Sequence, residues 1–394
     1  MRIGIDLTSI WRPATGNELL AIEMTHGLFR NDLKNEYVLF FSREVHKDFC
    51  AYIGRCEAIM APMSHELLVK HTWFDGAVKA ANLDYIHFPA FPPPWKLSCP
   101  MGWTLPDATP WLHSGTMKFK SRWYYKVVGG HAARTNRIVI TDSEASRDDL
   151  IKYVNVPRER VHVIYPGLRS IFLGRHDSAA FESVRERLGV PREFILFVGT
   201  LEPRKNLSRI LAAFSKLKTA GSFDPALVIV GRKGWLYNPV FAEIRRLDLT
   251  KHVHLTGYVS DDDLVNLYQM ASLLVFPSIY EGFGFPAIEA MASRCPVVTS
   301  DRGAQFEVTQ GCAVHCDPEN VDSIAKAIQE THEDRRLRAK LIASGLRCAS
   351  SFSWDRYAQE FLSVVHQSFN GVCSRSAHEH FASSEQMHAP VNTI

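Results

Sequence analysis

Short apolar runs alternate with amphipathic segments along the first half of the chain. The apolar runs predict strands at residues 2–7, 37–41, 85–88, 102–105, 137–141 and 161–165. The segments between them predict helices near residues 18–30, 65–81, 118–135 and 144–153. The runs are rich in Val, Ile and Phe and do not alternate with polar residues, which is typical of parallel strands buried on both faces.

The second half repeats this alternation after an interruption. Strands are predicted at 194–199, 226–230, 253–256, 273–276 and 296–299, and helices near 207–217, 240–248, 261–270, 286–293 and 321–330. A charged stretch at 169–191, with a short helix at 179–188, indicates a connection between two domains. Two successive α/β alternations predict two doubly wound domains that face each other across a cleft. We expect an N-terminal domain over 1–175, a C-terminal domain over 190–354, a last helix at 354–369 and a disordered tail over 371–394.

The composition is that of a globular protein with enough residues for two cores, at 394 residues, 46% hydrophobic and 22% charged. A formal net charge of only +3 argues against nucleic acid as a partner. No apolar run reaches membrane-spanning length, and the chain enters a strand at residue 2, so no signal peptide is expected. The eight cysteines are scattered, and we expect free thiols in a reducing, cytoplasmic compartment.

One basic segment, 118–137, leaves two interpretations open. It holds six Lys or Arg residues and no acidic residue, with Phe119, Trp123, Tyr124 and Tyr125 interleaved. Such a segment can lie on an anionic membrane surface as a peripheral contact. It can equally be a solvated basic face whose aromatic side chains pack inside.

The most informative stretch is a pair of carboxylates, Glu281 and Glu289, within Glu-Gly-Phe-Gly-Phe-Pro-Ala-Ile-Glu. An apolar strand at 273–276 precedes it, and the helix at 286–293 and the strand at 296–299 follow. This order puts a helix N-terminus and free backbone N–H groups at the carboxyl end of a parallel sheet, where α/β folds bind ligands. Glu281 would face the ligand from the loop, and Glu289 from the helix.

This stretch resembles the Glu-x7-Glu motif of retaining glycosyltransferases of the GT-B fold, family 4 (group 1). The segments 197–206 (Phe-Val-Gly-Thr-Leu-Glu-Pro-Arg-Lys-Asn), 141–147 (Thr-Asp-Ser-Glu-Ala-Ser-Arg) and 352–354 (Phe-Ser-Trp) are similar to the same family and occur in its order. The resemblance covers about residues 1–370 and implies two Rossmann-like domains, with a C-terminal helix at 355–370 that crosses back to the N-terminal domain.

The resemblance also implies an activity. It is closest to bacterial mannosyltransferases of surface polysaccharide assembly, so the donor expected first is GDP-mannose and the expected acceptor is a lipid-linked glycan. Breaking the anomeric bond places negative charge on the leaving diphosphate, which fixed cations must hold. Arg204 and Lys205 suit this task, with Asn206 capping the following helix. The matching positions give these candidates: for catalysis Arg204, Lys205, Glu281 and Asp107, and for donor binding Gly16, Gly199, Arg232, Gly282, Phe283, Gly284, Phe285 and Glu289.

The first half departs from the family pattern at two places. Many relatives carry His-Asp after the strand near residue 105, whereas this chain has Pro106-Asp107. The usual glycine-rich loop after the first strand has a single glycine, Gly16. His113 could substitute for the missing histidine or be an ordinary loop residue. These departures leave an alternative, a catalytically impaired nucleotide-sugar-binding scaffold of a glycan-assembly complex, and a third interpretation is a nucleotide-sugar epimerase.

No metal or cofactor is expected. Asp261-Asp-Asp263 follows Ser260 and precedes an apolar helical pattern, which indicates a helix start rather than a metal-binding acid pair. Cys312, His315 and Cys316 lack a second ligand pair at zinc-like spacing, and the segment 313–318 is interpreted as a strand and its turn.

Overall fold

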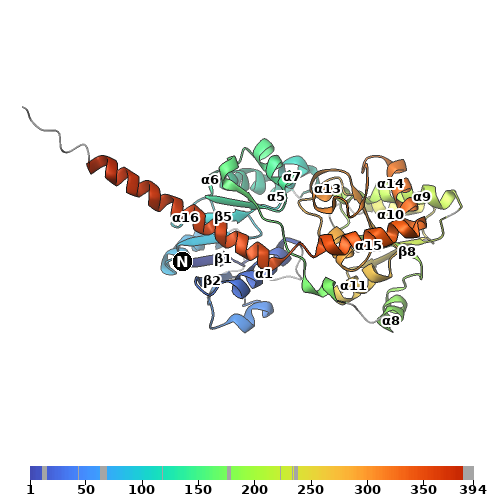
Figure 1. The fold of residues 1–394 in the computed structure, drawn as a ribbon, viewed down its shortest axis with the longest axis horizontal. Coiled ribbons are helices and arrows are strands. Elements are labelled where there is room, and N and C mark those ends of the chain that lie inside the picture. Colours follow the sequence, from blue (N-terminus) through green and yellow to red (C-terminus); the bar gives the residue numbers. More distant parts are fainter. Residues whose placement is uncertain are drawn as a thin grey trace, which may run out of the picture.

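The computed structural model describes residues 1–10, 16–42, 44–62, 69–117, 119–174, 179–221, 223–232, 234 and 238–384, and no side chain is described beyond Phe369. The molecule is elongated, with two α/β halves that lie end to end (Figure 1). The tail predicted to be disordered, 371–394, falls outside the described side chains, and 385–394 lies outside the described residues.

The first half is built on a seven-stranded parallel sheet in the order β3-β2-β1-β4-β5-β6-β7. The six strands predicted for this half are confirmed, and β3 was not predicted because its residues are mostly exposed and form no apolar run. The strands are β1 (Arg2–Asp6), β2 (Glu36–Phe41), β3 (Glu57–Met60), β4 (Tyr85–Phe88), β5 (Met101–Thr104), β6 (Ile138–Thr141) and β7 (Val161–Val163).

The second half is built on a six-stranded parallel sheet in the order β10-β9-β8-β11-β12-β13. Its strands are β8 (Phe194–Val198), β9 (Ala226–Val230), β10 (Val253–Gly257), β11 (Leu274–Phe276), β12 (Val297–Ser300) and β13 (Val314–Cys316). The last of these confirms the strand interpretation of the Cys312–Cys316 region.

The strand order reverses direction at equivalent places in the two sheets, between β1 and β4 and between β8 and β11. In doubly wound sheets such a switch point opens a crevice at the carboxyl ends of the strands, and ligands bind there. The predicted class, two Rossmann-like sheets covered by helices, is therefore confirmed. The exact domain boundaries near 175–190 stay a prediction.

Helices cover both faces of each sheet (Figure 1). Two predicted helices are continuous helical runs that contain a wider π-helical turn: α5-η4-α6 covers 119–135 and α7-η5 covers 144–154. The sequence did not predict α4, α13 and α15, and residues 65–68 of a predicted helix lie outside the described residues. The α-helices are α1 (Gly16–Asn31), α3 (Phe74–Ala80), α4 (Thr109–Leu112), α5 (Phe119–Tyr124), α6 (Gly130–Thr135), α7 (Glu144–Asp149), α8 (Ala179–Leu188), α9 (Leu207–Thr219), α10 (Asn238–Arg246), α11 (Asp261–Met270), α12 (Phe285–Ala292), α13 (Gly303–Thr309), α14 (Val321–Glu333), α15 (Arg335–Ala349) and α16 (Trp354–Ser384). The short 3-10 and π segments are η1 (Lys47–Tyr52), η2 (Val69–Trp73), η3 (Ser114–Thr116), η4 (Tyr125–Gly129), η5 (Leu150–Val154), η6 (Arg158–Arg160), η7 (Ser170–Leu173) and η8 (Pro203–Lys205).

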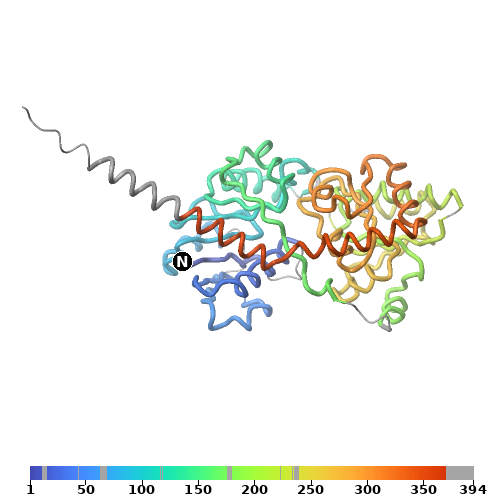
Figure 2. Tube along the Cα trace, viewed as in Figure 1, coloured from blue at the N-terminus to red at the C-terminus, as the bar shows by residue number. Residues whose placement is uncertain are grey.

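The last helix, α16, crosses back from the second half and packs on the first, as Figure 2 shows by the red tube beside the blue one. Tyr357, Phe361 and Val365 are fully buried in the same core cluster as Ile3 and Ile5 of β1. The C-terminal helix therefore completes the core of the N-terminal half, and the predicted crossing is confirmed.

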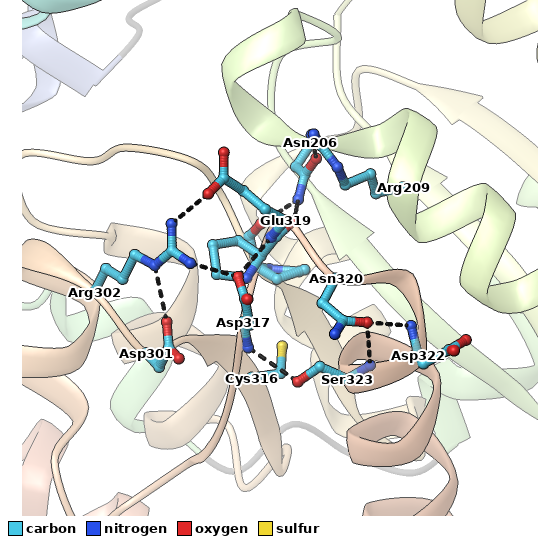
Figure 3. Close-up of polar contacts among 12 residues, drawn as sticks. Asn206, Arg209, Asp301, Arg302, Cys316, Asp317, Glu319, Asn320, Asp322 and Ser323 are labelled. Atoms are coloured by element: carbon cyan, nitrogen blue, oxygen red, sulfur yellow. Dashed lines mark hydrogen bonds and ion pairs between the residues drawn. The ribbon is translucent and has the colours of Figure 1, made fainter.

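Asn206 joins three loops at the carboxyl end of the second sheet. Its side-chain amide donates to the carbonyls of Pro277 (2.9 Å) and Pro318 (2.6 Å), so it fixes the start of α9 against the ends of β11 and β13. Asn206 is the N-cap residue of α9, as predicted, but its side chain makes no capping hydrogen bond, and its Oδ1 accepts from Nη1 of Arg209 at 3.1 Å. Figure 3 shows Asn206 above the loop that leads to Asn320, whose side chain caps α14.

Candidate active site

A cavity of about 590 Å³ lies between the carboxyl ends of the two sheets. The loops after β5 and β6 and the start of α1 line it from the first half, and the loops after β8 and β11 line it from the second. Every predicted site residue except Arg232 contributes to its wall: Gly16, Asp107, Gly199, Arg204, Lys205, Glu281, Gly282, Phe283, Gly284, Phe285 and Glu289.

Arg232 is one step removed from the cavity. Its guanidinium lies over the ring of Tyr258, 4.2 Å from the ring centroid, and Tyr258 itself lines the cavity. A contact of Arg232 with a donor stays a prediction.

Arg204, Lys205 and Glu281 form a buried ionic cluster in the cavity wall. Nζ of Lys205 donates to Oε1 of Glu281 at 2.6 Å, and Nη1 of Arg204 donates to Oε2 at 2.8 Å. The three side chains are only 8–14% exposed. Burial by itself would raise the pKa of Glu281, but the two cations outweigh it and lower that pKa to about 2. Glu281 is therefore an anion at neutral pH.

The two cations are fixed in position. Arg204 also donates to the carbonyl of Tyr280 at 2.6 Å and to Oε1 of Glu202 at 2.8 Å. Burial acts to lower the pKa of Arg204, but Glu281 and Glu202 raise it overall. Burial lowers the pKa of Lys205, and Glu281 opposes that shift. The positive groups are thus preorganised before any ligand arrives, which is what electrostatic stabilisation of a leaving anion requires.

The glycine loop after β11 brings the two halves into contact. A Cβ atom on Gly282 would lie 2.9 Å from the Pro106 carbonyl oxygen and 3.0 Å from the Asp107 Cβ, so only glycine fits there. Gly284 has a φ of +103°, a left-handed conformation that other residues rarely adopt, just before α12 begins. The loop glycines therefore serve the close approach of the halves as well as the approach of a ligand.

The second carboxylate, Glu289, is held by an arginine that the sequence did not single out. Tyr268 donates its hydroxyl to Oε2 of Glu289 at 3.1 Å, and Nη2 of Arg169 lies 3.7 Å from Oε1. Arg169 also donates to both carboxylate oxygens of Asp261, at 2.7 and 3.2 Å. Burial raises the pKa of Glu289, and Arg169 opposes the rise.

Asp261, the first of the three consecutive acids, has a role beyond starting α11, because it pairs with Arg169. Asp261 lines the cavity, whereas the helix start itself is as predicted, with Ser260 accepting from the N–H of Asp263 at 3.2 Å. No local sequence pattern marks Arg169 as a site residue, because it lies in the charged connection between the domains. The tertiary fold brings it close to Glu289.

On the first-half side, Asp107 and Asp142 approach each other at the strand ends. Asp107 accepts from the N–H of Thr109 at 2.7 Å. Asp142 is 2% exposed, and burial, with the neighbouring charge of Asp107, raises its pKa well above the ordinary value. The sequence did not predict Asp142 as a site residue. His113 does not line the cavity, and its ring packs on Tyr280 with centroids 5.0 Å apart.

The described residues contain no group of three or more His, Cys, Asp or Glu side chains placed to hold a metal ion. Seven cysteines of the described part are free thiols. In the same part, no helix is both long enough and apolar enough to cross a bilayer.

Two facing doubly wound sheets, with a charged cavity between them and a C-terminal helix that returns to the first half, define the GT-B class of glycosyltransferase fold. Residues 180–347 match the model of the family of glycosyl transferases group 1. Over nearly its whole length the chain also superimposes on sucrose-phosphate synthase from Thermosynechococcus elongatus, with a TM-score of 0.74, 19% identity, and 94% of this chain and 99% of that chain covered. That structural likeness establishes the fold alone.

Two curated relatives are mannosyltransferases by name. The O-antigen chain mannosyltransferase B of Escherichia coli is 31% identical over 219 residues, which cover 56% of this chain and 58% of the relative. The serotype-specific mannosyltransferase WbdA of Escherichia coli is 28% identical over 339 residues, which cover 83% of this chain and 41% of the relative. The chain therefore spans less than two thirds of the length of these relatives.

Proposed function

We propose that the protein transfers a hexosyl group from a nucleotide diphosphate sugar to a glycan acceptor, with retention of configuration, in bacterial polysaccharide synthesis. The names of the relatives make mannosyl from GDP-mannose the first donor to test. The observation that carries the proposal is the preorganised cluster of Arg204, Lys205 and Glu281 in the cavity between the two sheets.

The cluster suits the charges of this reaction. The bond between the anomeric carbon and the diphosphate breaks, the acceptor oxygen bonds to that carbon, and the proton of the acceptor hydroxyl passes to the departing diphosphate oxygen. Negative charge grows on the diphosphate, and the remaining N–H groups of Arg204 and Lys205 can donate to it. In the resembled family Glu281 faces the transferred sugar and diphosphate, while Glu289 accepts from the ribose hydroxyls. Tyr268 and Arg169 would hold Glu289 for this contact.

The proposed transfer uses no bound metal. The charge that a divalent cation would supply comes from the two side-chain cations, which lie within hydrogen-bond distance of Glu281. Turnover that is unchanged by EDTA would support this part of the proposal, and loss of turnover restored by Mg²⁺ or Mn²⁺ would refute it.

We further propose that the acceptor is lipid-linked and that α5 and η4 rest on the membrane surface. Phe119, Trp123 and Val127 are 72%, 58% and 40% exposed and lie on consecutive turns, so they form one apolar stripe. Lys120 and Lys126 flank this stripe. The exposed rings of Phe119 and Trp123 favour the membrane interpretation over one in which the aromatic side chains pack inside. Binding of the full chain to phospholipid vesicles tests this membrane contact.

The alternative function is a scaffold that binds nucleotide sugars without turning them over. It is motivated by Pro106, which stands where many members of the resembled family have a histidine. This alternative predicts nucleotide binding with no release of nucleoside diphosphate.

The deciding experiment measures nucleoside diphosphate release by the full chain from a panel of nucleotide sugars, with and without membrane extract as acceptor. We expect release from one donor, stimulated by the extract. Lys205→Met should reduce it about 100-fold or more, as loss of a charge-stabilising group in an active site does. Lys216→Met is the matched control, since Lys216 is 60% exposed and pairs with Asp322 on the surface. Binding without release would favour the scaffold, and interconversion of two nucleotide sugars without release would favour an epimerase.

A further inference from the structure

Tyr280, the residue before Glu281, reaches with its side chain into the first half of the molecule. Its hydroxyl donates to Oδ2 of Asp149 in α7 at 2.9 Å and accepts from the backbone N–H of Ala108 at 3.2 Å. Its ring packs on that of His113, with the centroids 5.0 Å apart. These three partners belong to the first half, whereas the backbone of Tyr280 follows β11 of the second half.

The backbone of Tyr280 supports the ionic cluster. Nη1 of Arg204 donates to the carbonyl oxygen of Tyr280, at 2.6 Å, and to Oε2 of Glu281, at 2.8 Å. The N–H of Ile279 in turn donates to the carbonyl oxygen of Arg204 at 2.9 Å. A shift of Tyr280 would therefore displace one hydrogen-bond partner of Arg204 and, through the chain, the neighbouring Glu281.

The residue on the other side of Glu281 also lies against the first half. The carbonyl oxygen of Gly282 accepts from Oγ of Ser146 at 3.3 Å. A Cβ atom on Gly282 would lie 2.9 Å from the carbonyl oxygen of Pro106. The first half therefore holds the loop on both sides of Glu281, by the side chain of Tyr280 and by the backbone of Gly282.

The carboxylate of Asp149 is half-buried, so it depends on the hydrogen bond that Tyr280 donates. Burial raises the pKa of Asp149, and the hydroxyl of Tyr280 opposes that rise. The contact thus favours the ionised carboxylate, and a hydrogen bond to an ionised group is stronger than one between neutral groups. Removal of the hydroxyl would leave both this carboxylate and the N–H of Ala108 with one partner fewer.

We propose that Tyr280 is a positioning residue for the transfer, because its hydroxyl connects the loop of Glu281 to the loop of Asp107 and so aligns the two walls of the cavity. This inference rests on the proposed function, since it gives Tyr280 a part in the same reaction. Tyr280 does not line the cavity, so it acts through Glu281 and Arg204 and does not touch the sugar.

The test removes each partner of the hydrogen bond in turn. Tyr280→Phe deletes the hydroxyl and keeps the ring, Asp149→Ala deletes the carboxylate, and Asp149→Asn keeps an acceptor oxygen. Tyr153→Phe and Asp148→Ala are the matched controls, on the same helical run α7-η5. Tyr153 is 44% exposed, the Asp148 side chain is 69% exposed, and neither lines the cavity. Donor turnover is measured for each full-length variant, and affinity for GDP and UDP by calorimetry.

We expect Tyr280→Phe and Asp149→Ala to lower kcat about ten- to 100-fold, as loss of a hydrogen bond to a charged group implies. Nucleotide affinity should stay unchanged, because Arg204, Lys205 and Glu281 keep their contacts within the second half. The double variant should be no slower than the slower single variant, since both changes remove the same bond. Asp149→Asn should recover most of the lost kcat, and the two controls should behave as wild type.

Amide hydrogen exchange tests the contact without turnover. In Tyr280→Phe the N–H of Ala108 loses the hydroxyl that accepts from it, so its exchange should become faster. The N–H groups of Glu144 and Ala145 should exchange as in wild type, because Glu307 still accepts from them.

Three results would overturn the inference. The first is a kcat of Tyr280→Phe equal to that of Tyr153→Phe. The second is a fall of kcat and nucleotide affinity together, which would mean that Tyr280 shapes the donor site itself. The third is exchange at Ala108 that Tyr280→Phe leaves unchanged. Failure of the proposed function is distinct, since wild type would then release no nucleoside diphosphate from any donor, while exchange at Ala108 would still decide whether Tyr280 joins the halves.

Discussion

At the scale of single residues, the site depends on how charges are balanced in a buried place. Glu281 receives hydrogen bonds from both Arg204 and Lys205, and Glu202 pairs with Arg204 as well. The four side chains therefore carry equal numbers of positive and negative charges. A diphosphate that enters must use the remaining N–H groups of the cations and competes with Glu281 for them.

The Glu281→Gln variant tests this balance through stability. The folded-state pKa of Glu281 is about 2, below its ordinary value of 4.5. Its ion pairs therefore stabilise the fold fully above about pH 4.5, and this contribution is lost as the pH falls through about 2. We expect the variant to lose roughly 3 kcal/mol of unfolding free energy at pH 7, with the difference shrinking below about pH 4.5. Urea unfolding across this pH range measures the difference in unfolding free energy between the variant and wild type. A difference that does not change with pH would contradict the prediction.

The same variant separates binding from transfer. With the competing anion removed, affinity for nucleoside diphosphate should be unchanged or higher, whereas donor turnover should fall steeply. Glu243→Gln is a suitable control, because Glu243 lines no cavity and, among the described residues, forms an ion pair with Arg246 one helical turn away. A Glu281→Gln variant that binds nucleotide poorly would show that Glu281 serves mainly to support the fold.

At the scale of elements, the basic and aromatic pattern of the segment α5-η4-α6 is compatible with either a membrane contact or a solvated face whose aromatic side chains pack inside. Its aromatic residues divide, since Phe119 and Trp123 are exposed whereas Tyr125 is half-buried and packs toward Trp103. The exposed stripe of Phe119, Trp123 and Val127 runs along one side of the segment. An element that exposes both apolar and basic side chains fits the interface of an anionic membrane.

We expect the full chain to bind anionic phospholipid vesicles and not zwitterionic ones, and more weakly as salt is added. The double substitution Phe119→Ser and Trp123→Ser should weaken this binding about tenfold or more, because it removes two large apolar side chains from the contact. Co-sedimentation with vesicles measures the binding of wild type and of the double variant. Leu33→Ser is the control, since Leu33 is 86% exposed and lies outside this segment. Equal binding by the double variant and wild type would rule the contact out.

At the scale of the whole molecule, the two halves are joined by more than the connection at 169–191. Glu307 of the second half accepts from the N–H groups of Glu144 and Ala145 at the start of α7 and from the Tyr165 hydroxyl. Tyr280 donates to Asp149 at 2.9 Å across the same cleft. The return of α16 to the first half adds a third connection between the halves. Together these contacts set the width of the cavity between the sheets.

The turn into α16 depends on a close backbone approach that Gly167 permits. A Cβ atom there would lie 2.2 Å from the backbone nitrogen of Trp354, so Gly167→Ala must displace the start of α16. We expect it to lower the unfolding free energy by about 3 kcal/mol, as overpacking against backbone does. The urea midpoint measures this. Gly76→Ala is the matched control, since a Cβ on Gly76 meets nothing within 4 Å, and it should be neutral or slightly stabilising. Equal midpoints would contradict the argument.

Much of the fold and part of the site could be predicted from the sequence. Buried parallel strands appear as unbroken apolar runs, so all strands except the exposed edge β3 were found. The glycine loop and the positions of Arg204, Lys205 and Glu281 at strand ends were visible because parallel strands bring their carboxyl ends to one edge. These inferences need only local periodicity and the order of elements.

Only the tertiary structure decided which distant residues meet. Arg169 reaches Glu289, and Gly282 lies against Asp107, although these residues are far apart in the sequence. No periodicity reports such contacts, because they depend on how two sheets are turned toward each other. The sequence by itself determined the two sheets and their charged edge. The packing of one sheet against the other, with α16 returning to pack on the first half, determined the shape of the site.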